Sequence, residues 1–143
     1  MNRLKHAVNA LFVIVALSSA AAQAADVYVV TSAENKQKLD MEDVKHIFGG
    51  DERKWQSGKN VVLAVPDLSS PEGEKMLDKI FSLSAKDYKK YWMQKVFKGD
   101  TTSPPENKNG DSMKQFLKAY PDAIGILPAD QIDASLRKVL KLD

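Results

Sequence analysis

The chain has 143 residues, of which 43% are hydrophobic, so it is long enough for one compact domain with its own core. It contains no cysteine, which excludes disulfides and a cysteine nucleophile. Its formal net charge is only +2 at pH 7. This balance argues against nucleic-acid binding and against a polybasic membrane surface, because both need a surplus of positive charge.

The first 24 residues predict a cleaved secretory signal peptide. Arg3 and Lys5 form a basic start, residues 7–17 are almost entirely apolar, and the small residues 18–24 end in Ala-Gln-Ala, the pattern that signal peptidase cuts. The alternative is an uncleaved membrane anchor, but this apolar run is too short to span a bilayer as a permanent helix. We therefore expect a periplasmic mature domain of residues 25–143, with no stable membrane insertion after cleavage.

Cleavage of the signal peptide would change the net charge and the histidine content of the protein. Arg3 and Lys5 account for the whole charge excess, so the mature domain is formally neutral. His6 is lost as well, and His46 is then the only histidine, which excludes a metal site built on several His or Cys ligands. His46 lies on a charged helix face, and we expect it to be solvated.

The first half of the mature domain predicts two strands and two helices. A β-branched run at residues 27–31 indicates a strand. Asp40 caps the first helix, in a capping-box-like pair with the aspartate three residues later, and two glycines end it. The apolar run at residues 61–65 is typical of a strand buried on both faces. Ser70, followed by a proline, begins the second helix.

A third helix begins after Ser84 and carries both an apolar stripe and a group of lysines. The stripe comprises Tyr88, Trp92 and Val96, with Met93 and Phe97 beside them. Side chains at this spacing favour a core face over a ligand platform. The lysines are Lys89, Lys90, Lys95 and Lys98. For these we favour a solvated face over an anion-binding patch.

The C-terminal part predicts one more helix and two strands. Residues 101–110 are too polar and proline-rich for regular structure. Ser112 and the glutamine three residues later form a capping box for a fourth helix, whose apolar face extends to Tyr120. Residues 123–127 and 137–142 read as strands, with a helical turn at 129–135 between them. Helices that alternate with buried strands predict a layered α/β fold.

Several short motifs follow one another in a specific order. They are Asp43-Val-Lys-His-Ile-Phe-Gly-Gly, Trp55 with Gly58, the strand at 61–65, Tyr91-Trp92, Phe97-Lys98-Gly99, Pro104-Pro105 and Ala123-Ile124-Gly125-Ile126. In order and spacing they resemble the phosphate-binding proteins of ABC-type phosphate importers, over nearly the whole mature chain. The resemblance implies a single periplasmic-binding-protein-like lobe, with a central mixed sheet flanked by about four helices. Proteins of that family clamp phosphate between two lobes, and this chain is less than half their length.

The resemblance also implies where a ligand would bind. The family's loop has the pattern Arg-Asp-x-x-Ser-Gly-Thr, in which the arginine, the hydroxyls and the amides at the helix start bind phosphate. Asp67 and Ser70 match this pattern, whereas Pro66, Pro71 and Glu72 stand where the arginine, glycine and threonine would be. These three changes remove a charged donor, remove an N–H and add a negative charge.

The candidate ligand-binding residues are therefore Asp67, Ser69 and Ser70, which would form a weakened anion site. The alternative is that Ser70 only caps the second helix. In the family the ligand lies in a cleft between the two lobes, so a single lobe leaves its wall of the cleft open to water. We therefore expect residues 66–70, with Leu68, to be exposed and to contact a second copy or another exported protein.

Two functions remain open. The first is an exported solute-binding-like domain for phosphate or another small oxyanion. The second is a protein-interaction module that kept the fold and lost the ligand. Catalysis is disfavoured because no acid, base or nucleophile forms an arranged constellation, and the sequence implies no cofactor, metal or nucleic-acid partner.

Overall fold

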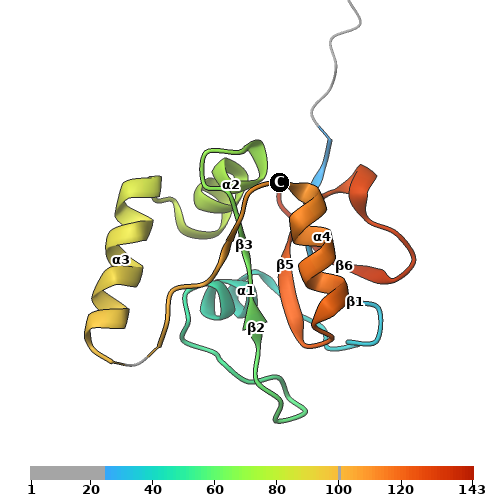
Figure 1. The fold of residues 1–143 in the computed structure, drawn as a ribbon, viewed down its shortest axis with the longest axis horizontal. Coiled ribbons are helices and arrows are strands. Elements are labelled where there is room, and N and C mark those ends of the chain that lie inside the picture. Colours follow the sequence, from blue (N-terminus) through green and yellow to red (C-terminus); the bar gives the residue numbers. More distant parts are fainter. Residues whose placement is uncertain (1–24, 100) are drawn as a thin grey trace, which may run out of the picture.

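The computed structural model describes residues 25–99 and 101–143, so the predicted signal peptide lies outside the described residues. The described part is an α/β fold, as expected, with helices packed on a mixed sheet (Figure 1). In chain order the elements are β1 (Val27–Ser32), α1 (Met41–Phe48), β2 (Val62–Leu63), β3 (Val65–Pro66), α2 (Pro71–Met76), the π-helical turn η1 (Leu77–Phe81), α3 (Ala85–Phe97), β4 (Glu106–Asn107), α4 (Gly110–Ala119), β5 (Ala123–Pro128), the 3-10 turn η2 (Ala129–Gln131) and β6 (Leu136–Lys141).

The main sheet is mixed and has the strand order β2-β5-β1-β6. β1 runs antiparallel to both β5 and β6, whereas β2 runs parallel to β5. The strands predicted at 27–31, 123–127 and 137–142 are confirmed, with boundaries shifted by about one residue. The first strand of the domain therefore lies inside the sheet, between two strands from the opposite end of the chain.

Successive residues of the central strands face two different layers, because the side chains of a strand alternate between its faces. Val29 packs into the larger core with α1, α2, η1 and α3, whereas Val30 packs with α4 on the other side. Gly125 of β5 allows α4 to lie close to the sheet, since a Cβ there would come within 2.5 Å of the Met113 sulfur. The result is a sheet between two helical layers.

The apolar run predicted as one doubly buried strand is divided in the structure. β2 lies at the edge of the main sheet, where Val62 and Leu63 are only half-buried. Ala64 separates it from β3, which leaves the main sheet and pairs in parallel with β4. β4 itself lies within residues 101–110, which we expected to be irregular. The composition of an apolar run does not show whether it forms one long strand or two short ones, because this depends on which strands it pairs with.

Capping side chains begin three of the helices as predicted. Asp40, Ser70 and Ser84 each accept a hydrogen bond from a backbone N–H of the first helical turn. α4 differs, because its N-cap is Asn109, and Ser112 serves as the third helical residue of the capping box. Asparagine and serine are nearly equivalent as N-caps, so composition does not discriminate between these two starts.

A small ionic cluster joins α4 to the turn that precedes β6. The ammonium groups of Lys118 and Lys114 lie 2.8 and 3.0 Å from a carboxylate oxygen of Asp133. The Ser135 hydroxyl and backbone N–H also donate to this carboxylate. These hydrogen bonds hold the pKa of Asp133 well below its usual range, with the largest contribution from Lys118, followed by Ser135 and Lys114. Asp133 is thus ionised throughout the neutral range.

α3 lies at one end of the molecule (Figure 1). Aromatic side chains of α3 pack into the larger core and attach the helix to the body. Tyr88 and Trp92 are buried, which confirms their assignment to the core. The Trp92 ring packs edge-on against Tyr88 and Tyr91, with centroid separations of 6.5 and 6.0 Å. It also covers Gly50, whose φ is 78° and whose Cβ would lie 2.5 Å from the ring, so both backbone and packing require glycine there.

The rest of the predicted stripe on α3 is not core. Met93, Val96 and Phe97 are 65%, 39% and 92% exposed, contrary to the prediction. Tyr120, placed on the apolar face of α4, is also exposed. Val96 and Tyr120 lie near the C-terminal ends of their helices, where the packed face is no longer covered. Met93 and Phe97 lie on the side of α3 opposite Tyr88, so the predicted stripe is wider than the face of the helix that packs on the body.

Candidate functional site

The candidate ligand-binding loop connects β3 to α2. Pro66 ends β3, and Pro71 is the first residue of α2. Between them the structure brings Asp67, Ser69 and Ser70 together at the start of the helix, where the resemblance placed them. Their hydrogen-bond partners determine whether this loop has donors to offer to an anion.

The three candidate side chains bond to one another and to the loop backbone. The Asp67 carboxylate accepts hydrogen bonds from the Ser69 backbone N–H at 2.8 Å and from its hydroxyl at 2.6 Å. The Ser70 hydroxyl donates to the Asp67 carbonyl at 2.6 Å and accepts from the Gly73 N–H at 3.0 Å. Ser70 is therefore the N-cap of α2, and Asp67 closes a turn over it.

Gly73 determines how closely the loop lies on the helix. It is buried in the first turn of α2, and a Cβ at this position would overlap the carbonyl oxygen of Asp67. Because no larger residue fits, the loop backbone rests directly on the helix start. This contact keeps the Ser70 hydroxyl in reach of the Gly73 amide in the first turn.

A second carboxylate, from β4, occupies another backbone donor of the loop. Glu106 accepts a hydrogen bond from the Leu68 N–H, with an N–O distance of 2.9 Å. The carbonyl of Asn107, the other residue of β4, accepts from the Asp67 N–H at 2.9 Å. No sequence pattern singles out Glu106, because it lies 38 residues away from Leu68 and reaches the loop only through the pairing of β3 with β4.

The loop therefore carries negative charge of its own. Hydrogen bonds from the Ser69 hydroxyl and N–H hold the pKa of Asp67 below its usual value, and Lys89 acts in the same direction. Amides at a helix start are the donors that normally favour an anion. Here the Gly73 amide of the first turn is bonded to the Ser70 hydroxyl. The amides of Ser69 and Leu68, which lie just before the helix, face carboxylate oxygens of Asp67 and Glu106.

Leu68 does not face water, so that expectation is wrong. Its side chain is only 5% exposed and belongs to the larger core. Of the neighbouring side chains, Ser69 is exposed, whereas Asp67 and Ser70 are half-buried. The surface of this loop is therefore small and polar, and a charged residue at position 68 would disrupt the core.

The polar side chains around α1 and α3 contact one another at the surface. His46 is exposed, as expected, with its Nε2 atom 3.3 Å from a Glu42 oxygen. Lys95 bonds to the Asp51 carboxylate, which lowers the pKa of Asp51 and raises that of Lys95. Such exposed pairs contribute little to stability.

Within residues 25–99 and 101–143, no group of three or more His, Cys, Asp or Glu side chains is arranged to hold a metal ion. Over the same residues, no helix combines the length and the apolar character that crossing a membrane requires.

Solved structures of phosphate ABC transporter substrate-binding proteins share this fold. An ABC-type phosphate transport receptor from Vibrio cholerae superposes with a TM-score of 0.63 at 15% identity, covering 81% of this chain and 46% of the receptor. A putative phosphate ABC transporter substrate-binding protein with bound phosphate, from Clostridium perfringens, gives 0.65 at 17% identity, with coverages of 81% and 45%. PstS from Borrelia burgdorferi gives 0.53 at 18% identity, with coverages of 74% and 42%.

The expected fold is confirmed. At these identities the similarity concerns the fold alone, and no protein-family model or curated protein matches the chain. The chain spans less than half the length of the solved structures that it matches.

Proposed function

We propose that this protein is an exported domain, with the fold of a phosphate ABC transporter substrate-binding protein, that docks to another protein and does not capture free phosphate. The observation that carries the proposal is that backbone amides of the loop are already hydrogen-bonded to carboxylates of the protein itself. The N–H groups of Leu68 and Ser69, in the loop just before α2, are hydrogen-bonded to the carboxylates of Glu106 and Asp67. Export is supported by the signal-peptide pattern of residues 1–24.

Electrostatics supports the loss of phosphate binding. Two like unit charges about 5 Å apart repel by about 3 kcal/mol at an effective dielectric constant near 20, before screening by salt. A phosphate at this helix start would meet two carboxylates, from Asp67 and Glu106, and a third acidic side chain follows at Glu72. Pro66 stands in place of a compensating arginine and Pro71 in place of an N–H donor.

A second candidate function is the binding of a small oxyanion at Asp67, Ser69 and Ser70. One observation favours it: the side-chain amide nitrogen of Asn107 is buried and has no acceptor among the described residues. Asn107 pairs with Pro66 at the edge of the loop. Binding there would require the Glu106 carboxylate to leave the Leu68 N–H.

Calorimetric titration of residues 25–143 with phosphate and with sulfate tests the proposal. We expect no measurable heat of binding for the unmodified domain at millimolar anion. Glu106→Gln removes the charge and keeps an oxygen acceptor, so any binding that appears only in this variant identifies Glu106 as the excluding group. Glu34→Gln, at an exposed position away from the loop, is the matched control.

Micromolar phosphate binding by the unmodified domain would overturn the docking proposal and favour the second candidate. A variant with both loop carboxylates neutralised, Asp67→Asn with Glu106→Gln, then shows whether the anion binds at this loop. A changed affinity would favour binding at this loop, because both carboxylates accept hydrogen bonds from its amides, whereas an unchanged affinity would favour a site elsewhere.

A further inference from the structure

The outward face of α3 combines positive charge with exposed apolar side chains. α3 and its C-cap contain five lysines and a single acidic residue, although the mature domain as a whole is formally neutral. One of these lysines, Lys95, is paired with Asp51. Lys86 and Lys90 are exposed and form no ion pair among the described residues.

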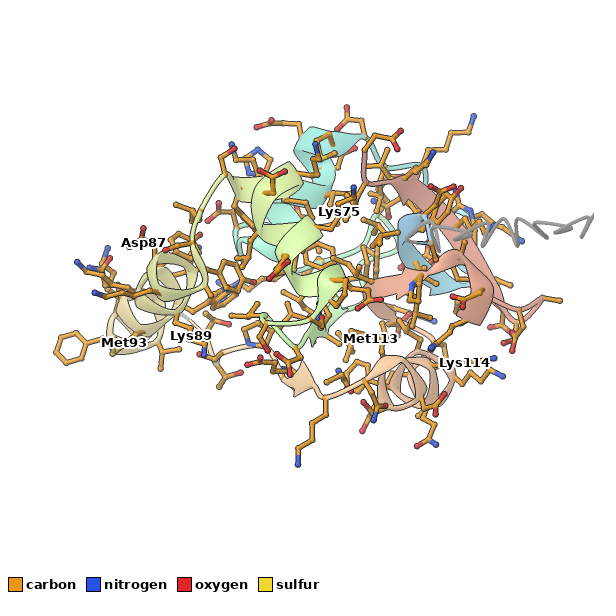
Figure 2. All side chains as sticks on the ribbon, turned by 90° about the horizontal axis from the view of Figure 1, so that it is seen from above. Lys75, Asp87, Lys89, Met93, Met113 and Lys114 are labelled. Carbon is orange, nitrogen blue, oxygen red and sulfur yellow. The ribbon has the colours of Figure 1, made fainter. Side chains whose placement is uncertain are left out.

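The exposed side chains fall on one stripe of the helix. Lys86, Lys90, Met93 and Phe97 follow one another at spacings of four, three and four residues, which places them on a common face. This face is opposite Tyr88 and the other aromatic residues that attach α3 to the body. Figure 2 shows Met93 on α3 at one end of the molecule. The stripe is basic over its first turns and apolar at its C-terminal end.

A groove lies beside this stripe, between α3 and the segment that leads into β4. Its volume is about 310 Å³. The apolar lining includes Leu68, Met93, Val96 and Pro104, and Lys89 lies at its side together with Glu106. The groove is large enough for an apolar side chain, and exposed apolar surface rimmed by charge is typical of a contact site for another protein.

We infer that this face of α3, with its groove, binds an acidic segment of a partner protein that carries a large apolar side chain. Charge complementarity selects the acidic segment, because Lys86 and Lys90 lack partners within the described residues. The groove receives the apolar side chain. This inference deepens the proposed docking function and rests on it.

Two other occupants fit the surface less well. A symmetric contact between two copies through α3 would place the same lysines opposite one another, which is repulsive. An anionic bilayer would contact the protruding lysines and Phe97 but would make no use of the groove beside Met93 and Val96.

The probe is a set of short random peptides displayed on phage and selected against immobilised residues 25–143. We expect the selected peptides to share acidic residues around a Phe, Trp or Leu. The tightest peptide is then synthesised, and its affinity is measured by fluorescence anisotropy. The double variant Lys86→Glu/Lys90→Glu should weaken it at least about tenfold, and Met93→Ser/Phe97→Ser should weaken it by a similar factor.

The control variant Lys36→Glu/Lys38→Glu makes the same charge change at exposed positions before α1, and it should leave the affinity unchanged. All four substituted positions on α3 are exposed, so circular dichroism should show that the variants keep the fold. Selected peptides without acidic residues, or an affinity insensitive to the α3 variants, would overturn the inference.

Sedimentation with vesicles of phosphatidylglycerol and phosphatidylcholine tests the bilayer, and a concentration series tests self-association. If the selection yields no acidic peptides and the domain binds anionic vesicles in a way that depends on Phe97, the occupant of this face is a membrane and not a protein. Self-association that the α3 variants abolish would replace it by a second copy. The phosphate titration reports on the loop at Asp67 and Ser69, whereas the peptide assay reports on α3. Phosphate binding would contradict the proposed function, and a lack of acidic peptides would contradict only the inference about α3.

Discussion

Replacement of Trp92 by alanine tests how α3 is attached to the body. Trp92 is 4% exposed and packs against Tyr88, Tyr91 and Gly50. A tryptophan buries about 150–250 Å², and at about 25 cal/mol per Å² this area corresponds to about 4–6 kcal/mol. Area estimates are upper bounds, and measured losses for such truncations are about 3–5 kcal/mol. We expect a loss in this range, a large share of the roughly 5–15 kcal/mol that stabilises a domain.

Urea denaturation of residues 25–143, followed by far-ultraviolet circular dichroism, measures this loss. Trp55 remains as a fluorescent reporter, since its indole N–H donates to the Asp122 carbonyl at 2.9 Å in another part of the fold. Phe97→Ala is the matched control on the same helix. Phe97 is 92% exposed, so its truncation should change stability by no more than about 0.5 kcal/mol. A Trp92→Ala loss below about 0.5 kcal/mol, or an equal loss for the two variants, would refute the assignment of the packed face.

Three further predictions concern stability, and urea denaturation measures each. Gly50→Ala should cost about 1–3 kcal/mol and more than Gly58→Ala, because both glycines have positive φ but only the Gly50 Cβ would meet Trp92; equal losses would contradict the packing argument. Asn109→Ala removes the N-cap of α4 and should cost about 1 kcal/mol, whereas no loss would mean that another residue caps the helix. Because the pKa of Asp133 is depressed on folding, its stabilisation is present above the unfolded-state pKa and is lost as pH falls. Asp133→Asn should therefore lower the urea midpoint of unfolding at pH 7. The difference in midpoint between this variant and the unmodified domain should shrink as pH falls from about 5 toward 2. A difference that does not change with pH would contradict the ionic role of Asp133.

The elements that depend on local chemistry could be predicted from the sequence. Asp40 and Ser70 cap helices by accepting hydrogen bonds from amides three residues away, so the signal lies in nearby residues. The buried β5 is a continuous apolar run and is equally clear. The division between β2 and β3 could not be predicted, because it depends on pairing with β4, which lies some forty residues later in a polar segment.

The position of the candidate residues beside a helix start could be predicted from the sequence, but the hydrogen-bonded state of the loop amides could not. Asp67 and Ser70 lie at the helix start where the resemblance implied them. Whether the loop amides are free depends on Glu106, which reaches Leu68 from β4. The exposure of Leu68 and of Phe97 was predicted in the wrong sense for a related reason. Hydrophobicity states which side chains prefer burial, and only the arrangement of neighbouring elements decides which are covered.

The central position of β1 has a consequence for the order in which the protein can fold. β1 is synthesised first among the strands, yet both of its neighbours, β5 and β6, come from the last 21 residues of the chain. Until these residues have been synthesised, β1 has no strand on either edge. Pairings this distant in sequence are slow to form. The main sheet therefore cannot close around β1 until synthesis of the chain is nearly complete.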